Sequence, residues 1–376
     1  MASQYRRRSL MLNTIAKVAQ GNPTIITDSS SRRLKRLDIF GQSSQDGTPS
    51  VENPIPIISK EVSEIKVTGL NLFNVEWIKG LDEYQSQSKN VASFPKGKYC
   101  LSVQGLTVTD LKKGAYLTVR IKVGEVYTNT YWIMHPSSPN TKCLTGLNFD
   151  VISDFQINLF IYNDDEEQLQ SVYDTLNGHI QLNNNFNAMP YEPYKEQKIT
   201  LADPITLRGI PVSSGGNVII DGKQYISDVI TEKDGVIGVE RDVEAFSLAI
   251  ADMNNNEDFP GWKPLDVVDK ILPPQANDTQ ITNTLCTIQS RTIYARRDIK
   301  LLYFSSDKSL GKTQAELIEQ YPDLSVDFAA ISYEPTFEPL PEEVQAQYKA
   351  LKSYYPNTVI QTGCWNEVTY SAKRGG

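Results

Sequence analysis

Apolar and polar residues alternate along much of the chain between residues 65 and 194. Short segments in which every second residue is apolar are separated there by polar turns, such as Lys113-Gly114 and Asn163-Asp164. A period of two places alternate side chains on opposite faces of a strand, so each segment predicts a β-strand with one buried face. Several short strands in one stretch favour an antiparallel sandwich or jelly roll. The clearest segments are YCLSVQGLTV, AYLTVRIKVG, VYTNTYWIMH and FQINLFIYN, with HIQLNN as a fifth.

The alternation continues on both sides of this stretch. Before it, residues 23–41 predict two strands joined by a polar turn. After it, alternating runs over residues 199–243 are joined by Asp221-Gly222 and Asp234-Gly235. Asp-Gly between such runs is a strong signal of a β-hairpin. We therefore expect a second β region, arranged as a meander.

The segment QDGTPSVENPIPI, residues 45–57, combines short apolar runs with many turn-forming residues. Pro54 and Pro56 lack the amide hydrogen that a central strand donates, so regular pairing is not expected there. We expect this segment to run extended over a neighbouring part of the protein and to bury its apolar side chains.

The remaining parts of the chain have a mixed pattern. Helices are predicted over residues 9–19, over Phe246 to Met253, after the capping-box residues Thr313 and Glu316, and over residues 341–351. Strands are predicted twice within residues 281–304, and residues 357–362 and 366–372 predict a closing hairpin.

Charge is unevenly distributed along the chain. The formal net charge is −8, yet residues 1–38 carry eight Lys/Arg and only two Asp. The acidic remainder argues against general nucleic-acid binding. The basic head could contact nucleic acid or an acidic partner, but a solvated or subunit-facing arm is the simpler interpretation.

The cysteines and the apolar runs restrict the location of the protein. Cys100, Cys143, Cys286 and Cys364 lie far apart and form no CxxC motif, which argues against a zinc site and fits a reducing cytoplasm. The N-terminal residues make a poor signal peptide because polar residues interrupt the apolar run. No apolar run reaches the length of a membrane span.

Sequence motifs for catalysis are scarce. Gly311-Lys312-Thr313 resembles the end of a phosphate-binding loop, but Ser306 stands where the first glycine is required. The two histidines, His135 and His179, have no catalytic motif around them, and we interpret both as structural or surface residues.

Acidic residues mark no clear site either. The run Asp164 to Glu167 could bind calcium weakly, but it lacks the alternating spacing that surrounds an ion with oxygens, and a solvated loop is the simpler interpretation. A glycosidase needs two opposed carboxylates, and nothing in the sequence marks such a pair. We therefore expect neither a resident cofactor nor a metal.

One aromatic cluster suggests binding. Alternation places Tyr127 and Tyr131 on one face of a strand and Trp132 on the other. Exposed aromatic rings can stack on a sugar ring, so these three residues are our candidates for glycan binding. The alternative is that Trp132 fills the core while the tyrosines cover the sheet.

Six characteristic segments occur in order between residue 45 and residue 360. They are QDGTPSVENPIPI, KVTGLNLFN, NNFNAMPYEPY, LRGIPVSSGGNVIIDGKQYISDVI, DGVIGVERDV and EEVQAQYKALKSYYPNTVI. Together they resemble tail-associated structural proteins of phages and prophages of Gram-positive bacteria, a family that includes minor tail, baseplate and receptor-binding components. Residues 75–183 carry no motif of the family, and LNNNFNAMP is less acidic than the family pattern.

The resemblance implies a mainly β protein in which a carbohydrate-binding-like jelly-roll sandwich is inserted in a second β scaffold, with a few short helices. The expected division is a basic arm over residues 1–31, the scaffold over 32–65 and 195–245, the jelly roll over 66–194, and a mixed α+β region over 246–376.

The resemblance also implies a virion protein without catalytic activity, assembled in the cytoplasm of the bacterial host. The expected partners are other tail or baseplate proteins, further copies of the chain, and bacterial cell-wall glycan, with neither nucleic acid nor membrane. Two alternatives remain open, namely a tail-associated cell-wall glycosidase and a purely architectural head-fibre or collar protein.

Overall fold

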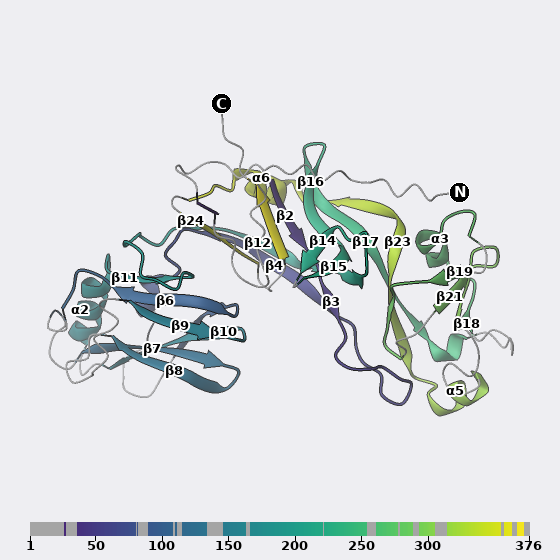
Figure 1. The fold of residues 1–376 in the computed structure, drawn as a ribbon, viewed down its shortest axis with the longest axis horizontal. Helices are drawn as coiled ribbons and strands as arrows, with labels where there is room; N and C mark the ends of the chain where they lie inside the picture. Colours follow the sequence, from purple (N-terminus) through teal and green to yellow (C-terminus); the bar gives the residue numbers. More distant parts are fainter. Residues whose placement is uncertain are drawn as a thin grey trace.

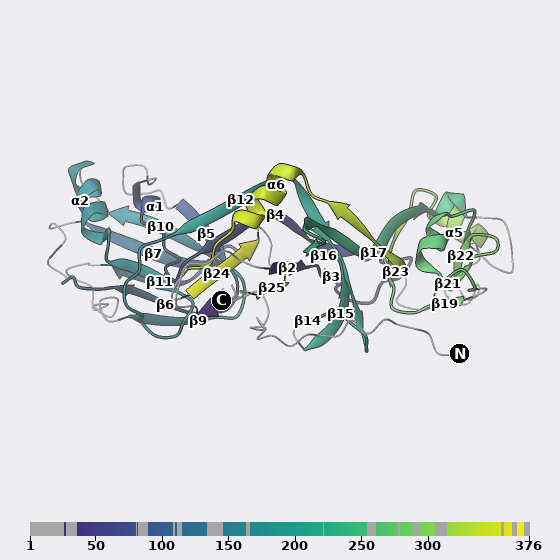
Figure 2. The same ribbon diagram turned by 90° about the horizontal axis from the view of Figure 1, so that it is seen from above.

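A computed structural model shows an elongated, mainly β protein with antiparallel sheets and few short helices, which confirms the expected fold class at that level. A lobe lies at each end, and long strands form the part between them (Figures 1 and 2). The helix predicted at residues 9–19 and most of the basic arm lie outside the described residues. The structure describes residues 26–27, 36–79, 81, 89–107, 110, 115–133, 146–162, 166–220, 222–253, 261–276, 279–288, 293–304, 314–354, 357–362 and 367–371.

The first lobe, residues 70–183, contains two sheets whose facing sides share one hydrophobic core. Short helices α1 (Glu76–Lys79) and α2 (Glu166–Leu176) add side chains to this core. The four-stranded sheet has the order β5 (Lys89–Phe94), β10 (Phe155–Tyr162), β7 (Tyr116–Val123) and β8 (Val126–Ile133). The three-stranded sheet has the order β11 (Ile180–Asn183), β6 (Gly97–Val103) and β9 (Leu147–Val151).

Aromatic rings occupy the middle of this core. Tyr99 lies 5.0 Å from Phe155 and 5.7 Å from Phe149, measured between ring centroids, and Phe94 stacks on Phe155 at 5.5 Å. The Tyr99 hydroxyl donates a hydrogen bond of 2.8 Å to the carbonyl of Pro95, which satisfies its polar group inside an apolar environment. These large buried rings supply much of the apolar area that holds the two sheets together.

All five strands predicted in this stretch are present, as β6, β7, β8, β10 and β11. The sequence pattern had missed β5, β9 and helix α2. Helix α2 begins at Glu166, within the acidic run.

The central part combines two sheets around helix α6 (Glu342–Ala350). The Tyr348 hydroxyl of α6 donates a hydrogen bond of 2.6 Å to the carbonyl of Leu37. One sheet has the order β1 (Ile26–Thr27), β24 (Asn357–Thr362), β4 (Ile58–Thr68) and β12 (Glu196–Leu207), with β3 (Ser43–Ser44) paired to β4. The other sheet, which curls into a half-barrel (Figure 1), has the order β20 (Leu285–Cys286), β23 (Ser325–Pro339), β17 (Val236–Ala249), β16 (Val229–Lys233), β2 (Arg36–Phe40) and β25 (Glu367–Ser371).

The predicted hairpin at Asp234-Gly235 is confirmed as the link between β16 and β17. Asp234 has a φ of 52° and Gly235 a φ of 82°, while Lys233 pairs with Val236. Positive φ at both central residues is the geometry of a type I′ turn, whose twist matches that of the flanking strands. A small three-stranded sheet of β13 (Gly209–Val212), β15 (Lys223–Ser227) and β14 (Val218–Ile220) precedes this hairpin.

Strands β4 and β12 carry the chain into and out of the first lobe. Thr68 pairs with Glu196 next to the lobe, and Lys60 pairs with Leu207 at the other end of the strand pair. The chain therefore enters and leaves the lobe at adjacent positions, as a compact insertion requires.

The far lobe, residues 250–328, has its own core around Trp262. The extended segment at residues 45–57 docks there, as expected: Val51 is buried in this core, and the amide of Ile55 donates a hydrogen bond of 2.8 Å to the carbonyl of Thr287. The elements are β18 (Gly261–Trp262), β22 (Leu301–Phe304), β21 (Ile293–Arg296) and β19 (Thr279–Ile281) in one sheet, with α3 (Val267–Ile271), α5 (Gln314–Gln320) and a 3₁₀ turn, η2 (Ile250–Asp252).

Two predictions about the later residues are wrong. Phe246 to Ala249 continue strand β17, because they pair with β23 and Phe246 stacks on Phe328 at 5.2 Å, and only η2 follows as a helical turn. The two last predicted strands exist as β24 and β25, but they form no hairpin with each other. Strand β24 pairs with β1 and β4, whereas β25 pairs with β2. Strands β24 and β25 and helix α6 thus pack with the scaffold strands, so the C-terminal region contributes to two parts of the molecule.

Candidate ligand-binding face

The outer side of the four-stranded sheet carries large aromatic and polar side chains. Along β7, Leu117, Val119 and Ile121 point into the core. The alternate residues of β7, including Tyr116 and Arg120, therefore lie on the outer side of the sheet. The outer face also receives side chains from β8 and β10. We call it the aromatic face and define it by Tyr116, Arg120, Tyr127, Trp132, Asn158 and Phe160.

A β-bulge changes which residues of β8 reach this face. Ile121 pairs with Asn129 but Lys122 pairs with Tyr127, so Thr128 is an extra residue in β8. The prediction that Tyr127 and Tyr131 share a face is therefore wrong. Tyr127 is 43% exposed and Trp132 is 38% exposed, on the outer side, whereas Tyr131 is only 8% exposed and packs in the core.

Tyr116 and Trp132 form a stacked pair at one end of the aromatic face. Their ring centroids lie 5.3 Å apart and the ring planes differ by only 3°. The two rings stand on neighbouring strands β7 and β8, where Thr118 pairs with Trp132. A paired arrangement of this kind holds the rings in fixed positions, which reduces the entropy lost when a ligand stacks against them.

Arg120 lies between two further rings of the aromatic face. Its guanidinium carbon is 5.4 Å from the ring centroid of Tyr127 and 5.1 Å from that of Phe160. These distances are in the range of cation–π attraction, which fixes the guanidinium without consuming its N–H donors. Within the described part of the chain, no carboxylate or other acceptor forms an ion pair or hydrogen bond with Arg120.

Asn158 adds a polar group that the protein leaves unsatisfied. It pairs with Arg120 across β10 and β7, is only 3% exposed, and donates a hydrogen bond of 2.8 Å from Nδ2 to Oδ1 of Asn90. Its own Oδ1 is buried and has no hydrogen-bond partner among the residues that the structure describes. A buried acceptor without a partner is unfavourable by about 1–3 kcal/mol, and a ligand that supplies a donor would relieve this cost.

Together these residues can hold a polyhydroxylated ring. Aromatic rings supply apolar stacking surface, the guanidinium supplies donors, and the two asparagines supply amide groups. The sequence analysis found Tyr127 and Trp132 but missed Arg120, Asn158, Tyr116 and Phe160. The alternation along β7 and β10 places these four residues on the face of each strand that is opposite to the apolar residues. The register between the strands, which brings the four residues together, cannot be derived from the sequence.

The other candidates from the sequence form no site in the structure. His179 lies in the turn before β11, where its Nδ1 is 2.6 Å from the carbonyl oxygen of Gln104. His135, Asp164, Asp165 and Gly311 to Thr313 lie outside the described residues. Cys100 and Cys286 are both buried. Among the residues that the structure describes, no group of three or more His, Cys, Asp or Glu side chains could hold a metal ion.

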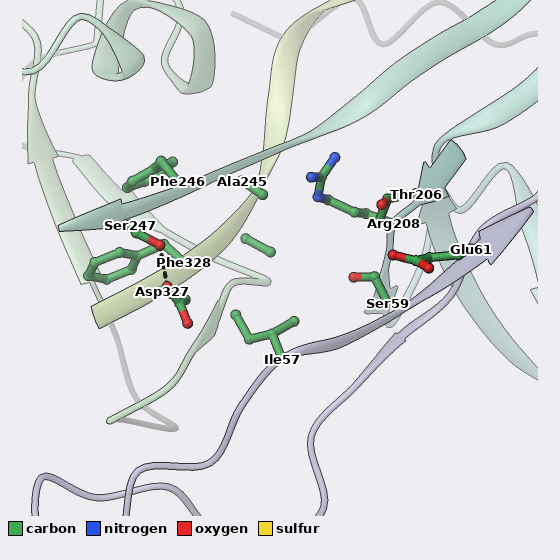
Figure 3. A pocket seen from close by; sticks show the side chains of 11 residues that line it. Ile57, Ser59, Glu61, Thr206, Arg208, Ala245, Phe246, Ser247, Asp327 and Phe328 are labelled. Atoms are coloured by element: carbon green, nitrogen blue, oxygen red, sulfur yellow. Dashed lines mark hydrogen bonds between the residues drawn. The ribbon is translucent and has the colours of Figure 1, made fainter. Parts of the chain in front are cut away.

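A concave region lies between the central part and the far lobe (Figure 3). This hollow of about 510 Å³ has an apolar side with Ile57, Phe246 and Phe328 and a polar side with Glu61 and Arg208. Ser247 donates a hydrogen bond to Asp327 at its edge. The lining residues include neither His nor Cys, so no Ser–His or Cys–His pair exists there.

Comparisons with known proteins leave the family of this chain open: no known protein family, no curated protein and no solved structure matches it. None of the helices in the described ranges has both the length and the apolar character needed to cross a membrane.

Proposed function

We propose that the protein is a structural component of a phage tail or baseplate that presents its first lobe, as a jelly-roll domain, for attachment to glycan on the host cell surface. The observation that carries the proposal is the aromatic face, which lies on a lobe at one end of an elongated scaffold (Figure 1). The six segments that resemble phage tail proteins support the same reading.

The strand order of the first lobe supports the jelly-roll part of the proposal. A jelly roll of eight strands has sheets of order 2-7-4-5 and 1-8-3-6. The orders β5-β10-β7-β8 and β11-β6-β9 correspond to these when the first strand is replaced by an irregular segment. We assign residues 70–73 to that place, because the amide of Leu72 donates to the carbonyl of Leu182 at 2.7 Å and Asn71 Nδ2 donates to the carbonyl of Ile180 at 3.1 Å.

The scaffold supports a role in assembly. Its sheets join strands from the beginning, middle and end of the chain, such as β2, β17 and β25, so segments that are far apart in the sequence are held together. Several copies on one particle would display several aromatic faces together. Weak individual contacts then add up, because the first attachment raises the effective concentration of the remaining faces.

The location on the particle is testable by electron microscopy. Virions would be produced from the bacterium that carries this sequence and labelled with an antibody against the purified full chain. We expect label at the distal end of the tail. Label on the head or collar would instead favour the architectural alternative, and particles without label would contradict the proposal.

The attachment role is testable by removing the lobe. Because Thr68 pairs with Glu196, residues 69–195 can be replaced by a two-residue Asn-Gly turn without moving β4 or β12. We expect particles that contain this variant to assemble but to adsorb poorly to host cells. Failure of the variant to enter particles would argue for a purely structural role. Zymography of the full chain on purified cell wall checks the glycosidase alternative, and we expect no cleared zone.

A further inference from the structure

We propose that the aromatic face selects an anionic glycan and that Arg120 is the residue that recognises the negative group. The inference rests on the proposed function, since it specifies the class of ligand for the same lobe. The anionic group can be a phosphate or a carboxylate, because a guanidinium binds both through paired N–H donors.

The state of Arg120 in the free protein is the first argument. Half-buried arginines in folded proteins normally pair with carboxylates, yet among the described residues no carboxylate pairs with Arg120, whose guanidinium lies over the rings of Tyr127 and Phe160. Lys122, on the same face of β7, differs in this respect, because its Nζ lies 2.8 Å from Glu125. Arg120 thus keeps its positive charge and its donors available for a ligand, and the two rings hold it in place.

Asn158 is the second, independent argument. In the described part of the chain its Oδ1 lacks a hydrogen-bond partner although the residue is only 3% exposed, and Asn158 lies directly across from Arg120. A hydroxyl group of a sugar next to the anionic group can donate to this oxygen once the covering side chains shift. The unsatisfied acceptor would then be satisfied only in the complex, which favours binding.

The rings complete the assignment to a glycan. Trp132 and Tyr127 are exposed aromatic side chains on β8, the edge strand of the sheet, and they flank the position of Arg120. An anion without a sugar would use only Arg120, and a neutral sugar would use only the rings and amides. A sugar that carries a phosphate or a carboxylate uses both.

The test is a binding titration of the purified full chain with two matched pairs of oligosaccharides. One pair is oligogalacturonate and its neutral methyl ester, and the other is phosphorylated mannan oligosaccharide and its dephosphorylated form. We expect at least one anionic oligosaccharide to bind about tenfold or more tightly than its neutral partner, as a charge-assisted contact provides. That preference should weaken when the salt is raised from about 50 mM to about 500 mM.

Variants assign the effect to Arg120. Arg120→Gln should reduce the affinity for the anionic member to that of its neutral partner, whereas Trp132→Ala should weaken both. Lys98→Gln is the matched control, because Lys98 also lies over an exposed ring, Phe186 at 5.4 Å, but on strand β6 of the other sheet. Circular dichroism confirms that each variant is folded.

Three outcomes would overturn the inference: equal binding of anionic and neutral members, an equal loss in Lys98→Gln and Arg120→Gln, or no binding of any of the four oligosaccharides. Antibody labelling of particles judges the proposed function separately. If the antibody labels the distal end of the tail and any of these three outcomes is found, the anionic ligand is rejected while the proposed role as a tail protein is kept.

Discussion

The guanidinium Nη1 of Arg241 lies 3.3 Å from the carboxylate Oδ2 of Asp228, which is completely buried. The other carboxylate oxygen accepts hydrogen bonds of 3.0 Å from the amides of both Asp242 and Val243. These amides lie at the bulge of β17, where the register with β23 shifts between Arg241 and Val243. A bulge leaves backbone groups unpaired, so Asp228 satisfies the amides that the bulge of β17 leaves without a strand partner.

The electrostatics of Asp228 follow from this position. Burial raises the pKa of its carboxyl, while the amide of Arg208, the guanidinium of Arg241 and the amide of Val243 oppose that rise. A buried charge of this kind is tolerated only with its partners in place.

Asp228→Asn should therefore be strongly destabilising. The new amide would direct N–H groups at the Arg208 amide and the Arg241 guanidinium, which are both donors. We expect a loss of about 3–5 kcal/mol in the free energy of unfolding, the range for breaking a buried ion pair.

Chemical denaturation measures the loss, and hydrogen exchange at Asp242 and Val243 should accelerate. Asp203→Asn, at an exposed residue of β12, is the control, with an expected change within about 0.5 kcal/mol. Equal effects of the two changes would show that the carboxylate does not hold the bulge.

Local features of the fold could be predicted from the sequence because they depend on neighbouring residues. The Asp234-Gly235 turn is an example, since both residues tolerate positive φ and the strands follow directly. Long-range pairing could not be predicted. Arg36 pairs with Ser371, and the amino-acid types at these positions contain no information about a partner at the opposite end of the chain.

The residues of the aromatic face also differ in how far the sequence could identify them. Tyr127 and Trp132 were recognisable as aromatic residues on a predicted strand. Their sharing of one face depends on the bulge at Thr128, which is defined only by the pairing of β8 with β7. Arg120 can be recognised as a site residue only when the registers of β7 with β8 and β10 are known, because the rings that lie near it, Tyr127 and Phe160, belong to those two strands.

Gly41 is required by a close approach of two backbones. A Cβ atom at this position would lie 2.3 Å from the carbonyl carbon of Leu207, at the end of β12. Gly41→Ala should lower the free energy of unfolding by about 1–3 kcal/mol, as overpacking does, because backbone atoms cannot move aside as a flexible side chain can. Thermal denaturation measures the change. Gly69→Ala is the control, since its Cβ would meet nothing closer than 3.7 Å. A Gly41→Ala protein as stable as Gly69→Ala would mean that β2 and β12 lie further apart than in this structure.

Trp262 should be the most important aromatic side chain of the far lobe. It is buried, its Nε1 donates a hydrogen bond of 2.7 Å to the carbonyl of Ala249, and Phe304 and Phe328 contact its ring edge-to-face at 5.5 and 5.6 Å. Trp262→Ala should cost about 3–5 kcal/mol through the cavity that it leaves. Hydrogen exchange should locate the loss in the far lobe. Trp132→Ala, at an exposed position, should change stability far less, and a comparable loss there would indicate that the aromatic face is part of a packed core.

Tyr99 should make the first lobe sensitive to alkaline pH. Burial, and next the nearby charge of Asp154, raise the pKa of its hydroxyl well above the ordinary value of 10.0. The unfolded chain releases this proton from about pH 10 upward while the folded lobe retains it, so stability falls as pH rises, by about 1.4 kcal/mol per pH unit. Tyr99→Phe removes this pH dependence of the stability. The variant also loses the hydrogen bond to the carbonyl of Pro95, so it should be about 1 kcal/mol less stable than the wild type at neutral pH. Urea unfolding from roughly pH 8 to pH 11 should therefore show the two stabilities converging. Tyr333→Phe, at an exposed residue, should follow the wild type throughout. A constant difference between wild type and Tyr99→Phe would mean that the Tyr99 hydroxyl ionises equally well in the folded lobe, and hence that it does not lie in the core between the two sheets.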